Sequence, residues 1–104
     1  MNHTVRIDLY VFQSLMPDLV GHDRSPSAFL VYLALWARGG ARRGNRVRIS
    51  HRELAEETGL SKSSVQAAVQ RLVRRRLITA AHASPTATPE YTVLRPWRRY
   101  PRSR

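Results

Sequence analysis

One stretch constrains this chain more than any other: residues 53–69, which read ELAEETGLSKSSVQAAV. A helical pattern runs into Gly59, stops, and begins again at Ser61. Glycine readily adopts the left-handed conformation that closes a helix, and serine is a favoured residue for starting the next one. The sequence therefore predicts two helices, over residues 51–58 and 61–75, joined by a turn so tight that they must cross at a steep angle.

Further signals support each predicted helix: a start signal in the first and an apolar face in the second. Ser50 and Glu53 have the spacing of a capping box, in which each residue satisfies a backbone N–H of the other. The second helix has apolar residues at spacings of three and four, which indicates one face packed against a core. These residues are Val65, Ala68, Val69, Leu72 and Val73.

The segments before and after this pair complete a small domain. Ser25 followed by proline predicts a helix over residues 25–38, whose broad apolar surface places it at the centre of the core. Val47 and Ile49 indicate a short strand. Two further strand-like runs, separated by ASPTATPE, predict a hairpin within residues 77–94.

The two ends of the chain are less regular. Residues 4–12 alternate between apolar and polar side chains, which predicts a short strand, and Pro17 is expected to interrupt a helical turn that follows it. The terminal segment, residues 96–104, combines prolines, aromatics and arginines without periodicity, so we expect a flexible basic tail. The expected domain is residues 1–95.

Charge and composition restrict the function. The chain has 104 residues, the size of one domain, with 18 Lys and Arg against 7 Asp and Glu, a net charge of +11. Such an excess favours a polyanionic partner. There is no cysteine, the four histidines lack metal-ligand spacing, and the longest apolar run has about half of the ~20 residues that span a bilayer. We therefore expect no enzyme, no cofactor, no metal and no membrane partner.

Residues 51–70, HRELAEETGLSKSSVQAAVQ, resemble the helix-turn-helix motif of bacterial DNA-binding proteins. The resemblance rests on position: small Ala55 in the first helix, Gly59 at the turn, and β-branched Val65 in the second helix, with Leu54 and Ala68 also fitting. The following hairpin looks like the wing of the winged variant, similar to the N-terminal domains of GntR-type repressors.

This resemblance covers roughly residues 25–95 and implies a fold that is mainly α with a small β-hairpin, a winged helix-turn-helix with a three-helix core. Such families usually have glycine after the second helix of the motif, where this chain has Arg76, which would then need a positive φ. We expect no ligand-sensing domain in this chain.

The resemblance also implies that the second helix enters the major groove of DNA, where base edges can be read. Glutamine can bond adenine, serine is permissive, and cations at the helix ends suit phosphates. The predicted DNA-binding residues are Arg52, Ser61, Lys62, Ser63, Ser64, Gln66, Gln70, Arg71, Arg74, Arg98 and Arg99. The sequence thus predicts a sequence-specific regulator of transcription that binds double-stranded DNA in the cytoplasm, at the nucleoid.

Two alternatives stay open. Winged helices also serve as protein-interaction modules, and a plasmid or phage replication initiator would look alike at this length. The sequence leaves the oligomeric state undecided, with a homodimer among the options.

Overall fold

A computed structural model describes residues 3–39 and 43–98. Three α-helices form its centre: α1 (Pro26–Gly39), α2 (His51–Thr58) and α3 (Lys62–Arg74). Two π-helical segments, η1 (Val11–Leu15) and η2 (Pro17–His22), precede them, and short 3-10 helices lie at η3 (Arg43–Asn45) and η4 (Pro96–Arg98).

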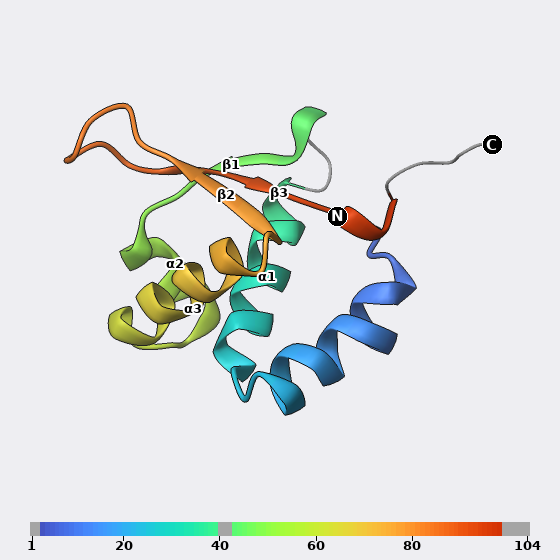
Figure 1. Ribbon diagram of the computed structural model, residues 1–104. Coiled ribbons are helices and arrows are strands. Elements are labelled where there is room, and N and C mark those ends of the chain that lie inside the picture. Colours follow the sequence, from blue (N-terminus) through green and yellow to red (C-terminus); the bar gives the residue numbers. More distant parts are fainter. Residues whose placement is uncertain (1–2, 40–42, 99–104) are drawn as a thin grey trace.

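The strands form one antiparallel sheet in the order β1-β3-β2. β2 (Ile78–Ala81) and β3 (Glu90–Val93) make the predicted hairpin, and β1 (Arg46–Arg48) pairs with the other edge of β3. Figure 1 shows the loop of the hairpin on the same side of the molecule as α2 and α3, with α1 between these two helices and the N-terminal helical stretch. This arrangement confirms the predicted fold class, a mainly helical winged helix-turn-helix.

The core is built around α1. Tyr32 and Trp36 are fully buried, as are Leu54 of α2 and Leu72 of α3, so the three helices share one apolar cluster. The polar atoms of the two α1 aromatics are satisfied, since the Tyr32 hydroxyl donates to the Leu94 carbonyl at 2.8 Å and Trp36 Nε1 donates to the Arg6 carbonyl at 2.7 Å. The buried face predicted for α3 is therefore correct apart from Val73, which is 41% exposed.

The strand predicted for residues 4–12 is wrong. Residues 3–8 have no regular structure, and a helical stretch runs from Leu9 to His22. Val11, Leu15 and Leu19, four residues apart, bury one face of it against the core. Pro17 does not end this stretch, because it occupies the first position of η2, where a missing N–H costs little.

The segment after β3 also differs from the expected tail, because its first residues pack on the N-terminal segment. The ring of Trp97 stacks on Tyr10 with centroids 4.6 Å apart and lies parallel to Trp36 at 6.2 Å. Trp97 Nε1 donates a 2.7 Å hydrogen bond to Asp8. Residues 96–98 therefore join the folded domain through contacts with residues about 90 positions earlier.

The end of α3 has the hydrogen bonds of a Schellman motif. The N–H of Leu77 donates to the Leu72 carbonyl at 2.9 Å, and the N–H of Arg76 donates to the Val73 carbonyl at 3.0 Å. Arg76 has φ 58°, the left-handed conformation that this motif requires and that glycine usually adopts. A β-carbon costs roughly 1 kcal/mol in this conformation.

Replacing Arg76 with glycine is therefore expected to raise the free energy of unfolding by about 1 kcal/mol. Arg74→Gly is the matched control: the same residue change, made at the last helical residue of α3, should lower it by up to about 1 kcal/mol. Urea unfolding of both variants measures the two differences. Destabilisation by Arg76→Gly would show that the arginine side chain contributes more than its backbone conformation costs.

Candidate nucleic-acid interface

The turn between α2 and α3 sets the crossing of the two helices. Gly59 has φ 80°, and its N–H donates to the Ala55 carbonyl at 2.9 Å, which closes α2. The hydroxyl of Thr58 donates to the Leu54 carbonyl and accepts from the N–H of Leu60, so the turn is fixed by side chains as well. α3 then leaves the turn with one face against the core and the other away from it.

Capping side chains hold the first turns of both helices. At α2, the Ser50 hydroxyl accepts from the Glu53 N–H and the Glu53 carboxylate accepts from the Ser50 N–H, both at 3.1 Å. The Ser50 hydroxyl also donates to the carboxylate, and the hydrogen bonds that this carboxylate accepts from the Ser50 N–H and hydroxyl lower the pKa of Glu53. At α3, the Ser61 hydroxyl accepts from the Ser64 N–H at 3.1 Å and donates to the Ser64 hydroxyl at 2.9 Å. Ser61 and Ser64 are thus occupied in shaping the helix start.

The outward face of α3 carries most of the side chains predicted to contact DNA. Gln66 and Gln70 are exposed one turn apart, with Ser63 preceding them and Arg74 following on the same face. Lys62 is exposed at the first position of the helix. No residue of α3 is acidic, so this face presents hydrogen-bonding groups between two cations.

Two arginines flanking this face differ in their environment. Arg52 is 83% exposed and lies 3.6 Å from Glu56 on its own helix, an exposed pair that is worth only about 0.3–0.5 kcal/mol. Arg71 points to the other side of α3, where it lies 3.7 Å from the nearly buried Asp23. Arg52 is free enough to exchange Glu56 for a phosphate. Arg71, in contrast, pairs with Asp23 and so helps to hold the N-terminal helix against α3.

Arg98 lies apart from α3. Its Nε and Nη2 donate to the two carboxylate oxygens of Asp8 at 2.7 and 2.5 Å, a bidentate pair. The hydrogen bond from Arg98 is the main reason why the pKa of Asp8 is lowered. Arg98 is thus held within the folded domain rather than in a free tail, its predicted contact with DNA stays a prediction, and Arg99 lies outside the described residues.

Two aspartates and a histidine lie together where η2 meets α3. Asp18, His22 and Asp23 bring ligand atoms within 4.8 Å of one another. Arg75 pairs with both aspartates, and Arg71 adds a further cation at Asp23. Because these arginines already balance the carboxylates, the cluster ties the N-terminal helix to α3.

Two histidines that the sequence analysis left without a role meet beside α3. His51 and His82 are 31 positions apart, yet both line one pocket of about 270 Å³, together with Lys62. Burial lowers the pKa of His51, with smaller contributions from Lys62 and His82. The capping box predicted that His51 lies at a helix start. No pattern in the sequence indicated that the hairpin would place His82 beside His51.

A helix with an acid-free outward face, held by a tight turn beneath a wing, is the arrangement with which a winged helix-turn-helix protein binds DNA. The sequence profile of the MarR family matches residues 28–87, more than half of the chain. The chain belongs to the MarR family, and is thus a DNA-binding transcriptional regulator rather than a member of an enzyme family. Searches of curated proteins and of solved structures found no match to the chain.

The family corrects the finer resemblance to GntR-type repressors. Both kinds of domain share a helix, a short strand, the helix-turn-helix and a wing in the same order, so the order of elements does not separate them. The positions that carried the resemblance, such as Ala55, Gly59 and Val65, are those that any tight helix crossing requires.

Within residues 3–39 and 43–98, no helix combines the length and the apolar character that spanning a bilayer requires.

Proposed function

We propose that this regulator binds double-stranded DNA in a sequence-specific manner by placing α3 in the major groove. The observation that carries the proposal is the exposed, acid-free face of α3, on which Gln66 and Gln70 lie between the cations Lys62 and Arg74. Glutamine offers a donor and an acceptor in one plane and can bond the edge of adenine in two-pronged fashion.

Phosphate contacts would come from the ends of this face. Lys62 begins α3, and Arg52 lies at the start of α2, the helix that crosses the backbone in proteins of this fold. Both residues are exposed. Arg74 is suited to the same role at the far end of α3. These contacts position the protein, while the glutamines specify the bases. Acting on chromosomal DNA, the protein would work in the cytoplasm at the nucleoid.

The N-terminal helix offers a surface for a second copy. Leu9, Phe12, Met16 and Val20 form a stripe along its outer side, each at least 39% exposed. Residues 7–23 contain no lysine or arginine, so two copies could meet there without the repulsion expected of a chain with net charge +11. Proteins of this family typically dimerise. We therefore propose a homodimer that joins through this stripe.

Selection of binding sites from random duplex oligonucleotides tests both proposals. A sequence-specific dimer should enrich two inverted half-sites whose centres are about 10 base pairs, or a multiple of that, apart. Enrichment of a single half-site would contradict the dimer. If no sequence is enriched, the protein does not read bases, and a protein-interaction module becomes the better description.

Gln66→Ala and Gln70→Ala are expected to weaken binding to the selected site by about 1–3 kcal/mol each and to leave binding to random duplex nearly unchanged. The reason is that a base contact counts only where the right base is present. Gln13, which is exposed on η1 rather than on α2 or α3, gives the matched control Gln13→Ala, which should alter neither. If the glutamine variants weaken specific and random binding equally, these residues do not read bases.

A further inference from the structure

A pocket lies where the wing meets the starts of α2 and α3. Its volume is about 270 Å³. The capping residue and the first two residues of α2 line it, together with the first residue of α3. The hairpin adds the residue that follows β2 and the residue that precedes β3. The lining residues are Ser50, His51, Arg52, Lys62, His82 and Pro89. Four of these six side chains are cationic or can become so, and none is acidic.

The fold holds these basic groups close together although their positive charges repel one another. His51 is partly buried, and this burial, with the nearby Lys62 and His82, disfavours its charged form. The backbone N–H groups at the start of α2 and α3 add partial positive charge on the same side. An anion in this pocket would relieve the mutual repulsion of the side chains and accept their hydrogen bonds.

We propose that this pocket holds a phosphate of the DNA backbone, and that His51 and His82 take up protons when it binds. The inference rests on the proposed function, because it assigns a backbone contact of the same complex. The pocket opens beside Lys62, the residue from which the outward face of α3 begins. A backbone phosphate is a monoanion that can accept several hydrogen bonds, which matches a pocket lined by imidazole, ammonium and guanidinium groups.

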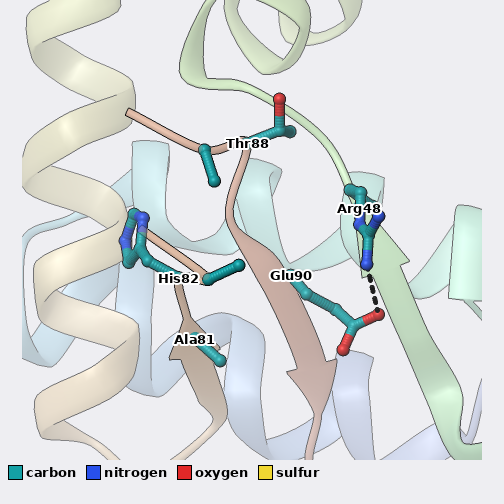
Figure 2. Close-up of a pocket in the computed structure, with 7 residues that line it drawn as sticks. Arg48, Ala81, His82, Thr88 and Glu90 are labelled. Atoms are coloured by element: carbon teal, nitrogen blue, oxygen red, sulfur yellow. Dashed lines mark ion pairs between the residues drawn. The ribbon is translucent and has the colours of Figure 1, made fainter. Parts of the chain in front are cut away.

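The acidic groups nearest the histidines already have other partners. Glu53 is held in the capping box with Ser50. Glu90 lies across a neighbouring pocket from His82, 3.7 Å from Arg48. Figure 2 shows this ion pair on the opposite side of that pocket from the imidazole of His82. The groups that face the two histidines are thus Lys62 and Arg52, and an arriving phosphate would be their principal negative partner.

Proton uptake has a definite sign. A bound phosphate favours the protonated imidazole, so the affinity for DNA should rise as the pH falls through the range in which histidine titrates. In the free protein, the pKa of His51 is below its ordinary value of 6.5, so the unfolded chain binds this proton more readily. Acid below about pH 6.5 should therefore reduce the stability of the free protein while it strengthens binding.

Fluorescence anisotropy of a labelled mixed-sequence duplex, at constant ionic strength between about pH 5.5 and 8, tests the proposal. The wild-type protein should bind about tenfold more tightly at the acid end for each histidine that gains one pKa unit of preference for its proton. His51→Gln combined with His82→Gln should give weak binding that does not vary with pH. His51→Gln combined with His82→Arg should also remove the variation but bind more tightly at neutral pH.

His22→Gln is the matched control, because His22 lies on the N-terminal helix with its side chain 82% exposed, away from the pocket, and should keep the wild-type pH dependence. Circular dichroism shows whether each variant is folded. If wild-type affinity does not change with pH, or if its change persists in the double glutamine variant, the phosphate pocket is wrong while the proposed function stands. If the wild-type protein binds no duplex at any pH, the proposed function itself fails.

Discussion

Replacing Leu72 with alanine is expected to lower the free energy of unfolding by about 2–5 kcal/mol. The side chain is fully buried in the cluster that joins α1, α2 and α3. It also supplies the carbonyl that accepts from Leu77 at the end of α3, so a cavity here lies directly under the turn into the wing. A loss of this size should lower Tm by at least roughly 10 °C in a domain of about 100 residues.

Val73→Ala is the matched control for this experiment. Val73 is the next residue of α3 but is 41% exposed, so its truncation should change the free energy of unfolding by no more than about 0.5 kcal/mol. Urea unfolding of the two variants compares the faces of the helix directly. Equal losses for both would mean that α3 does not pack with the face described here.

The motif was predictable from the sequence because its signals are local. Capping serines, a glycine in the left-handed conformation and an apolar stripe all lie within residues 50–74, the segment that they organise. The left-handed Arg76 was predictable for a related reason: the resemblance shows where a glycine usually stands, and the backbone must turn there whichever residue is present.

The N-terminal segment was predicted wrongly because its pattern fits two structures. Val5, Ile7, Leu9 and Val11 alternate as in a strand, while Val11, Leu15 and Leu19 have helical spacing. Packing against the core decides between them: residues 9–22 bury their helical stripe, and Leu9 is left 63% exposed.

Contacts between distant parts of the chain were out of reach of sequence reasoning. Asp8 binds Trp97 and Arg98, and His51 meets His82 at the wing. None of these contacts has a spacing that indicates an interaction, because the first two depend on the two ends of the domain packing together and the third depends on where the hairpin lies over α2. The same reason explains why the acidic partners of Arg71 and Arg98 from the N-terminal region were not predicted.

Binding to duplex DNA should weaken steeply as salt is added. About 5–8 phosphate contacts would give a slope of roughly −4 to −7 in a plot of log affinity against log salt. Affinity would then fall by about two to four orders of magnitude between about 50 and 200 mM salt. The net charge of +11 and the exposed cations Arg52, Lys62 and Arg74 motivate this expectation.

Two charge-neutralising variants separate the interface from the overall charge. Lys62→Gln should make the slope shallower by about one, since it removes one phosphate contact. Arg6→Gln removes the same charge from an exposed residue of the N-terminal segment, which Figure 1 shows on the opposite side of α1 from α3, and should leave the slope unchanged. Equal effects of the two variants would mean that overall charge, rather than the start of α3, governs binding.

The salt titration of the wild-type protein, followed by fluorescence anisotropy of a labelled duplex, tests most directly whether this chain binds DNA through phosphate contacts. The structure predicts a straight line with a slope of roughly −4 to −7. A slope near zero, or no binding at low salt, would contradict it.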